Sequence, residues 1–433
     1  MNDDFVTTEF KRVSNTWKKT ALLFLSSQTL SLFGTMLVQY AILWYITLEA
    51  KSGVMLSLLI VIGVLPMLFL SPFAGVWADR YDRKKLIILS DSLVALTTLG
   101  LAIAFALGYE AYWLFFLASF LRAIGQGIQM PAVAAFVPQF VPKEHLMRVN
   151  GLLGSIQAAT MLVAPMAAGA LMSIAPLQTI FYIDVVTAAL AVLVMTVFVR
   201  VPPHARASNP AAEKTATFHD LKLGFRYVRH HTYLTRFFLF SALFMFLVAP
   251  VAFLTPLQVA RSFGEDVWRL TAIEVLFSIG MMLGGGLLSI WGGFRNRVYT
   301  MMLATVIVGS FTIALGLVPW FWVYLVLMGV VGISMPLFNT PATVLLQEHV
   351  EEAYMGRVFS VMTMISSSAM PAGMLMFGPL GDVIAIEWLL IGTGAGIVLL
   401  GVALKRSRVL IDAGWPESTV SETSDPTPES TTD

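Results

Sequence analysis

Long apolar stretches dominate this sequence of 433 residues. Twelve of them are almost free of charge, and each is close to or above the roughly 20 residues that a helix needs to cross a bilayer. The stretches are continuous and do not alternate in polarity, which favours helices over the strands of a barrel. The sequence therefore predicts an all-α membrane protein with twelve transmembrane helices, at about Ala21–Thr47, Ser52–Ala78, Leu86–Leu107, Tyr112–Val137, Gly151–Ile174, Leu177–Val199, Leu234–Val259, Leu270–Trp291, Val298–Val318, Phe321–Leu346, Phe359–Leu380 and Trp388–Leu404.

The composition excludes several classes of protein. Hydrophobic residues make up 57% of the chain and charged residues only 12%, which rules out a soluble enzyme and a disordered protein. A net charge of +1 gives no general attraction to nucleic acid. The sequence has no cysteine and no Gly-Lys pair, and its six histidines lie outside the predicted helices. We therefore expect no enzyme activity, no cofactor and no metal.

The distribution of lysine and arginine predicts the orientation. With both termini inside, the inner segments hold 23 of the 27 basic residues, and the outer loops hold Lys51, Arg261 and Arg269. The remaining one, Arg122, lies within a predicted helix. Because basic residues are retained on the cytoplasmic side, we expect both termini to be cytoplasmic.

The twelve stretches fall into two sets of six, separated by a polar segment from Arg200 to His231. A proline- and arginine-containing stretch that begins at Pro131 is followed by a similar one at Pro341, 210 residues later, which weakly supports a duplication. Parallel repeats of this kind occur in transporters whose solute site lies between the two halves. We predict two six-helix halves, at residues 1–199 and 234–410, joined by a linker at residues 200–233. Residues 411–433 are rich in Ser, Thr, Pro and Glu, and we predict that they form a disordered tail.

The linker has a helical pattern of its own. Phe218, Leu221, Phe225 and Val228 are three, four and three residues apart, which places them on one face of a helix. We predict a basic amphipathic helix on the inner membrane surface. A solvated linker without such a helix is the alternative.

Arg122 is the basic residue that we place inside the membrane, near the midplane of the fourth helix. A charge there is costly, so it is a functional candidate by default. The spacing puts Ser119, Gln126 and Gln129 on the same face. The alternative is a structural arginine that pairs with a carboxylate across the bundle.

Three acidic residues within the helices are candidates for proton coupling, because burial favours the protonated form of a carboxyl group. Glu274 is the first choice, since Thr271 and Ser278 share its face. Asp184 is the second, with an interfacial residue exposed to lipid headgroups as the alternative. Asp91 is expected to pair with Arg83 or Arg148 and to serve gating or structure.

The loop after the second helix reads Gly-Val-Trp-Ala-Asp-Arg-Tyr-Asp-Arg-Lys-Lys from Gly75 to Lys85. It resembles the signature of the major facilitator superfamily, G-x-x-x-D-R-x-G-R-[RK]-[RK], with Asp in place of the second Gly. The resemblance implies a gate in which Asp79 holds the two halves together at the inner face, next to Arg80. It also implies that Gly75 permits close helix approach and that Arg83 pairs with an acidic neighbour. The alternative is a basic inner loop with incidental acids.

Further segments resemble bacterial drug exporters of the macrolide-efflux type, a group related to the siderophore exporters of the same superfamily. They are Asp79–Lys85, Pro131–Arg148, Ile273–Gly286 and Gly356–Pro371. Pro165 and Gly169 resemble part of the exporter motif G-x-x-x-G-P-x-x-G-G, with ordinary helix packing as the alternative. The stretch from Arg122 resembles the family's fourth-helix motif R-x-x-Q-G, shifted by one residue, which implies that this arginine helps to move protons.

In this family the first, fourth, seventh and tenth helices line the solute cavity. A polar face on the first helix and another on the tenth fit a water-filled cavity, although hydrogen bonding between helices is the alternative. The 23 methionines and 30 phenylalanines point weakly to a hydrophobic solute. With the polar residues of the fourth helix, the predicted cavity residues are Gln28, Ser31, Thr35, Gln39, Ser119, Gln126, Gln129, Asn339 and Thr343.

We therefore expect a secondary active exporter in the inner membrane of a bacterium. It would exchange protons for hydrophobic, drug-like solutes such as macrolide antibiotics, by alternating access and as a monomer. The expected partners are this solute, protons and the lipid bilayer, and no nucleic acid. The alternatives are a siderophore or lipid exporter or an uptake facilitator of the same fold, and a membrane sensor or scaffold that transports nothing.

Overall fold

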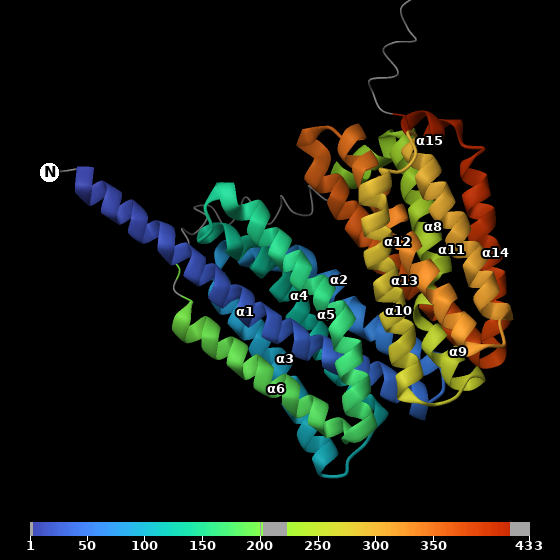
Figure 1. Ribbon diagram of the computed structural model, residues 1–433, viewed down its shortest axis with the longest axis horizontal. Coiled ribbons are helices and arrows are strands. Elements are labelled where there is room, and N and C mark those ends of the chain that lie inside the picture. Colours follow the sequence, from blue (N-terminus) through green and yellow to red (C-terminus); the bar gives the residue numbers. More distant parts are fainter. Residues whose placement is uncertain (1–2, 200, 202–222, 416–433) are drawn as a thin grey trace, which may run out of the picture. The chain divides into compact units, whose positions relative to one another are not determined.

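The computed structural model describes residues 3–199, 201 and 223–415, without the side chains of residues 3–16, 71, 72, 79, 352 and 353. The regular structure of these residues is helical (Figure 1). The longer helices are α1 (Asp3–Glu49), α2 (Gly53–Arg80), α3 (Arg83–Ala106), α4 (Tyr112–Phe136), α5 (Leu146–Ile174), α6 (Leu177–Leu193), α8 (Thr232–Phe253), α10 (Val267–Trp291), α11 (Arg297–Leu317), α12 (Phe321–His349), α13 (Glu352–Val383) and α14 (Ile386–Leu404). Short helices are α9 (Thr255–Ser262) and α15 (Arg408–Ala413).

The described residues contain 12 helical spans that are long and apolar enough to cross a membrane. They coincide with the twelve predicted stretches, so the predicted all-α membrane class is confirmed. The seventh span differs in detail because it breaks at Leu254, between α8 and α9. Pro250 lies inside α8 and Pro256 at the start of α9. A proline lacks the amide hydrogen that a continuous helix needs, which accounts for the interruption.

The chain after the last span is packed further than the sequence predicts. The predicted tail begins at residue 411, but α15 runs to Ala413. The Gly414 carbonyl accepts a hydrogen bond from the backbone nitrogen of Arg297 at 3.0 Å, and the Asn296 amide donates to the Ile411 carbonyl at 2.8 Å. These bonds hold the chain as far as residue 414 against the start of α11. Residues 416–433 of the predicted tail lie outside the described part.

The predicted linker helix is described in its second half. Residues 223–230 are helical, whereas Phe218 and Leu221 lie outside the described residues. Val228 is buried and Phe225 is exposed. Tyr227 stacks on Tyr354 of α13, with ring centroids 4.4 Å apart.

The described chain forms two compact units. The first contains α1 to α6 together with residues 253–275 and 374–383, and the second contains residues 223–252, 276–373 and 384–415. In the first, α4 packs on α2 and α3, and α1 packs on α5 and α6. Its core includes Phe24 against Phe136 and, elsewhere, Phe105 against Phe115. In the second, α11 packs on α12 and α14, and Phe244 stacks on Phe338.

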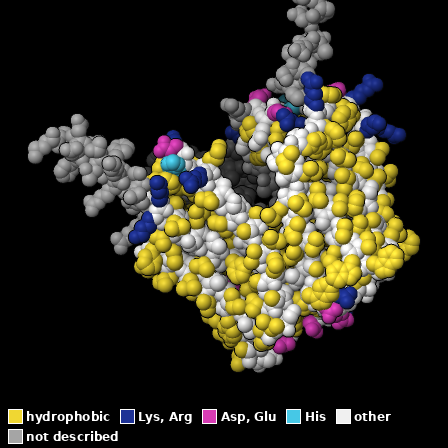
Figure 2. All heavy atoms as spheres, in the orientation of Figure 1, with side chains coloured by type: hydrophobic (Ala, Val, Ile, Leu, Met, Phe, Trp, Pro, Cys, Tyr) yellow, Lys and Arg dark blue, Asp and Glu magenta, His cyan; other side chains and the backbone are white. Residues whose placement is uncertain are grey.

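Hydrophobic side chains cover the flanks of the helices in Figure 2, and charged side chains gather at the helix ends. Exposed residues such as Leu239, Ile290 and Trp322 belong to this apolar surface. Such a surface suits contact with lipid hydrocarbon and not with water.

Within the first unit, a carboxylate from the end of α13 caps the start of α2. Asp382 accepts hydrogen bonds from the Ser52 hydroxyl at 2.7 Å and from the backbone nitrogens of Gly53 and Val54 at 2.7 and 3.0 Å. Arg261 of α9 forms an ion pair with the same carboxylate at 2.8 Å. Because the first amides of a helix have no partner within it and carry partial positive charge, this contact stabilises both the helix end and the acid.

Candidate solute cavity and buried charge network

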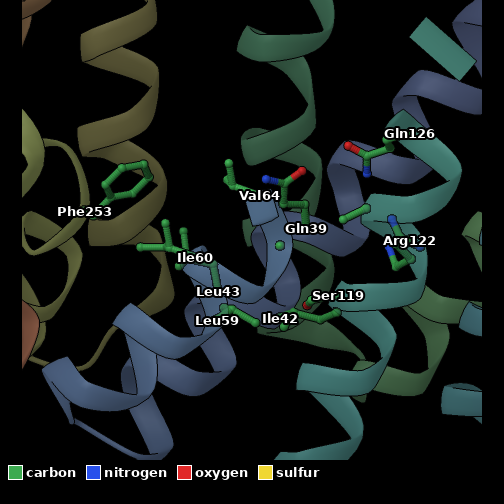
Figure 3. Close-up of a pocket in the computed structure, with 12 residues that line it drawn as sticks. Gln39, Ile42, Leu43, Leu59, Ile60, Val64, Ser119, Arg122, Gln126 and Phe253 are labelled. Carbon is green, nitrogen blue, oxygen red and sulfur yellow. The ribbon is translucent and has the colours of Figure 1, made fainter. Parts of the chain in front are cut away.

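A cavity of about 180 Å³ lies in the first unit, between α1, α2, α4 and the end of α8 (Figure 3). Four of its lining residues are polar, namely Gln39, Ser119, Arg122 and Gln126. All four are among the predicted cavity or coupling residues, and the structure brings them together. The apolar part of the wall consists of Ile42, Leu43, Leu59, Ile60, Gly63, Val64, Ala123 and Phe253.

The local sequence explains this mixed wall. Ser119, Arg122 and Gln126 are three and four residues apart, so one face of α4 presents all of them. The α2 residues Leu59 and Ile60 lie in a stretch of mostly aliphatic side chains and supply apolar surface to the same cavity. The arrangement can bind a solute that combines a large apolar body with a few hydrogen-bonding groups.

Arg122 is at the centre of a buried network. Its Nη1 pairs with Asp184 of α6 at 2.8 Å and also donates to the Thr98 hydroxyl of α3, while its Nη2 donates to the Thr35 carbonyl of α1 at 2.9 Å. The side chains of Arg122 and Asp184 are 5% and 1% exposed. The network therefore joins four helices. Its ion pair between Arg122 and Asp184 is the contact that the structural alternative for Arg122 requires.

Asp184 is completely buried in this network. The alternative expectation, an interfacial residue exposed to headgroups, is therefore wrong. The Thr98 hydroxyl donates to Asp184 Oδ2 at 2.8 Å and so supports the pair from α3. The interfacial alternative is based on the position of Asp184 near a helix end. The side chain is buried all the same, because α1, α3 and α4 pack around it.

Gly34 allows α1 and α6 to approach at the network. A Cβ at this position would lie 2.6 Å from Asp184 Oδ1 and 3.2 Å from the Asp184 Cα atom. Contacts below 3.0 Å are not tolerated, so a larger residue would displace the carboxylate or the helix. The glycine thus leaves room for Thr187 and the Asp184 carboxylate of α6 beside α1.

Asp91 of α3 forms a second polar cluster. Its Oδ1 accepts hydrogen bonds from the Ser31 hydroxyl at 2.6 Å and from the Gln129 amide at 2.7 Å. Asp91 Oδ2 is buried and has no hydrogen-bond partner among the described residues. The sequence predicts Ser31 and Gln129 only as a common lining of the cavity, and the structure places both against this acid instead.

The expected pairing of Asp91 with Arg83 or Arg148 is wrong. Asp91 faces α1 and α4 inside the bundle, whereas the Arg83 guanidinium donates to the carbonyls of Ala78 and Ala135 at 2.7 Å each. A predicted position towards the inner surface suggests these two arginines as partners. The face of α3 that carries Asp91 points elsewhere.

The other predicted residues of α1 do not line the cavity. Gln28 and Thr35 are buried against neighbouring helices, at 9% exposure each, and the Nε2 atom of Gln28 has no partner among the described residues. Thr35 contributes its carbonyl to Arg122. Asn339 and Thr343 are on α12 of the second unit, where the Thr343 hydroxyl donates to the Asn339 carbonyl at 2.9 Å.

Glu274 lies on α10, in the part of that helix that belongs to the first unit. It is partly buried and makes no hydrogen bond or ion pair within the described ranges. A carboxyl group without a fixed donor or cation can gain and lose a proton without breaking such a contact.

The gating motif is described in part. The side chain of Asp79 lies outside the described residues. A Cβ built on Gly75 meets no described atom within 4 Å, so the expected close approach of helices at this residue is not seen among the described residues. Arg80 is partly buried. Asp82, which replaces the family glycine, caps the start of α3 with its side chain.

The exporter-motif residues Pro165 and Gly169 are both buried in α5. A Cβ at Gly169 would overlap the Thr271 side chain of α10. Small residues here therefore permit two helices of the first unit to pack closely, as the packing alternative requires.

Sequence reasoning missed Thr98, which accepts a hydrogen bond from Arg122. Threonine is common in membrane helices, so its identity gave no signal. The preference of a buried arginine for several acceptors could have directed attention to Thr98. Among the described residues, no group of three histidine, aspartate or glutamate side chains is arranged to hold a metal ion.

Residues 24–374 match the family model described as Major Facilitator Superfamily. The chain belongs to this superfamily. It is thus a multi-pass membrane transporter, and the family resemblance of the sequence is confirmed. A relative called macrolide efflux protein A from Streptococcus pyogenes is 30% identical over 395 residues, which cover 90% of this chain and 96% of the relative. The enterobactin exporter EntS of Shigella boydii is 22% identical, over 76% of this chain and 77% of the exporter.

Solved structures agree on the fold of the superfamily. A bacterial homologue of the human lysosomal transporter Spinster, in an inward-facing and unoccupied conformation, has a TM-score of 0.70 at 14% identity. The alignment covers 93% of this chain and 99% of that one. At this identity the similarity concerns the fold alone.

Proposed function

We propose that this transporter exports hydrophobic solutes of the macrolide type from a bacterial cell in exchange for protons. The observation that carries the proposal is the 30% identity to macrolide efflux protein A over nearly the whole of both chains. The mixed wall of the cavity supports it, because macrolides are large, mostly apolar lactones with several hydroxyl groups.

The charge of the cavity favours neutral or basic solutes. Its single lining cation, Arg122, is already paired with Asp184, so no free positive charge faces the solute from these walls. The volume of about 180 Å³ is below the roughly 300–1,000 Å³ of sites for drug-sized ligands. The solute must therefore contact additional walls, or these walls must separate during transport.

We assign proton coupling to Glu274 and Asp91. Both carry a carboxyl oxygen without a fixed cation, whereas Asp184 is paired with Arg122. On this proposal the Arg122–Asp184 pair is a structural joint between four helices. Release of a proton from Glu274 or Asp91 would change the charge of the interior and so the preferred state of the transporter.

Alternating access completes the proposal. Two six-helix halves, at residues 1–199 and 234–410, would rock about the cavity, with the motif at Asp79 closing the inner side. Both termini would be cytoplasmic and the transporter would act as a monomer in the inner membrane. The Lys and Arg distribution supports this orientation.

Siderophore export is the second candidate, supported by the similarity to the enterobactin exporter. Iron-free catecholate siderophores are rich in hydrogen-bonding groups and become anionic on deprotonation. The pairing of Arg122 with Asp184 disfavours such an anion in the cavity.

The test is an accumulation assay in bacterial cells that lack their own exporters. Cells that produce the protein should accumulate less radiolabelled macrolide than cells with an empty vector, and a protonophore should remove the difference. Unchanged accumulation, with the protein detected in the membrane, would refute macrolide export. A difference that survives the protonophore would refute proton coupling, and secreted catecholate in the same strain would favour the second candidate.

A further inference from the structure

A groove of about 380 Å³ lies in the second unit, between α8 and α14 near the start of α15. Its walls are apolar and include Leu239, Leu243, Leu400 and Leu404. Leu239 is 68% exposed and Leu243 43% exposed. The groove therefore opens on the flank of the helices, where a membrane protein meets lipid chains.

One end of this groove is basic. Arg236 of α8 and Arg406, just after α14, both line it. Neither guanidinium has an acidic partner within the described ranges. Arginines elsewhere, such as Arg261 and Arg297, are paired with carboxylates. Two unpaired cations beside this apolar groove are complementary to a molecule with an anionic head and a hydrocarbon chain.

A third polar group accompanies the two arginines at the groove. Ser407 lines it, and the Ser407 hydroxyl oxygen is buried without a partner among the described residues. A buried hydroxyl without a partner is costly. A phosphate or glycerol oxygen at this place would satisfy it.

The position along the membrane normal also fits. Arg236 lies one turn into α8, and Arg406 lies two residues beyond the end of α14. On the orientation predicted from the basic residues, this end of both helices is cytoplasmic. Anionic headgroups in the inner leaflet attract such juxtamembrane cations, and basic pockets between helices on this side bind them.

We propose that the groove is a binding site for an anionic phospholipid such as phosphatidylglycerol. The phosphate lies between Arg236 and Arg406, the Ser407 hydroxyl donates to a headgroup oxygen, and one acyl chain runs along the leucines of α8 and α14. The site belongs to the second unit and is independent of the solute cavity and of the proposed solute.

A different occupant would be the acidic segment 416–433, which follows α15 and carries five carboxylate side chains and no basic residue. It supplies negative charge but has almost no large apolar residue, and Val420 is its one aliphatic side chain other than proline. It cannot fill walls that consist of leucines. The observations therefore favour a lipid.

The test is native mass spectrometry of the purified full chain, delipidated in detergent and titrated with dioleoylphosphatidylglycerol. Dioleoylphosphatidylcholine is the comparison lipid, and glycerol 3-phosphate tests whether the headgroup alone is enough. We expect saturable binding of phosphatidylglycerol, and weaker binding of the other two. Equal binding of both lipids, or binding of glycerol 3-phosphate at similar concentration, would overturn the proposal.

Variants locate the site. Arg236→Gln with Arg406→Gln should weaken phosphatidylglycerol binding about thirtyfold, as expected for two cations at an anionic headgroup. The matched control, Arg226→Gln with Arg229→Gln, removes the same charge from an exposed helix outside the groove and should leave binding unchanged. Equal weakening by both pairs would overturn the proposal, because it would indicate general charge attraction.

Two further variants cover the remaining outcomes. Ser407→Ala keeps both arginines and should weaken binding several-fold, which provides a milder test if the double variant is unstable. A chain that ends at Trp415 should bind phosphatidylglycerol as the full chain does. If removal of residues 416–433 instead strengthens binding tenfold or more, the acidic segment competes for the groove, and the proposal that a lipid occupies it in the full chain is overturned.

Discussion

The Arg122–Asp184 pair allows a quantitative test of the buried network. In Asp184→Asn the guanidinium keeps its hydrogen bonds to Thr98 and to the Thr35 carbonyl but loses its counter-ion. Removal of one partner from a buried pair costs about 3–5 kcal/mol, because the remaining charge is left uncompensated. At about 2–4 °C per kcal/mol for a domain of about 200 residues, the unfolding midpoint should fall by roughly 6–20 °C.

The double variant Arg122→Gln with Asp184→Asn separates the pair from its surroundings. Neither side chain is then charged, and an amide at position 122 can still donate to Thr98. We expect the double variant to be more stable than Asp184→Asn, with a coupling energy of at least about 2 kcal/mol between the two positions. The free energies are compared by thermal unfolding in detergent, followed through tryptophan fluorescence.

The control is the exposed pair of Lys51 with Glu265, whose side chains are 43% and 60% exposed. Glu265→Gln should cost less than about 1 kcal/mol, since water screens such a pair. If Asp184→Asn unfolds at the same temperature as the unmodified protein, or if the double variant is no more stable than Asp184→Asn, the network does not hold the four helices together.

Three further variants test the coupling acids and the helix contact. Glu274→Gln should abolish uphill, proton-driven export in proteoliposomes while solute binding persists, because an amide carries no proton; uphill export at the normal level would exclude this acid. Asp91→Asn keeps the oxygen that accepts both hydrogen bonds but puts an amide nitrogen at the buried Oδ2 position, so it should cost about 1–3 kcal/mol of stability. It should also reduce the protons moved per solute, and an unaltered ratio in a pH-electrode assay would remove it from the coupling scheme. Gly34→Ala should cost about 1–3 kcal/mol of stability through overpacking against Asp184. The control Gly100→Ala should not destabilise the protein, because a Cβ there meets nothing within 4 Å. Equal unfolding midpoints for the two variants would contradict the close approach of α1 and α6 at Gly34.

The positions of the helices could be predicted from the sequence because a membrane span has a simple requirement, a long stretch without charge. The start of α6 at Leu177 and the extent of α4 from Tyr112 agree within a residue. The break at Leu254 could not be predicted in this way, since the stretch around it is apolar throughout. Only the two prolines carry the signal, and many prolines are tolerated inside membrane helices.

The partners of the buried charges were harder to predict. The cost of a buried charge indicates that Arg122 and Asp184 need partners, but 62 positions of sequence separate them, and several acids were available. For Asp91 the expected partners Arg83 and Arg148 were the wrong choice, because the direction of its side chain depends on the rotation of α3 in the bundle. On α1 the same spacing identified Gln39 and Ser31, yet only Gln39 reaches the cavity. Spacing defines a face of a helix, whereas its neighbours decide what that face contacts.

The cap on α2 can form only late in the synthesis of the protein. Gly53 receives its carboxylate from Asp382, which the ribosome adds 329 residues later. At about 5–20 residues per second, roughly 15–65 seconds separate the two events. During that time the first helices are already in the membrane, but the amides at the start of α2 lack this partner and must be satisfied by water or lipid headgroups. The start of α2 therefore acquires this cap only after α13 has been made.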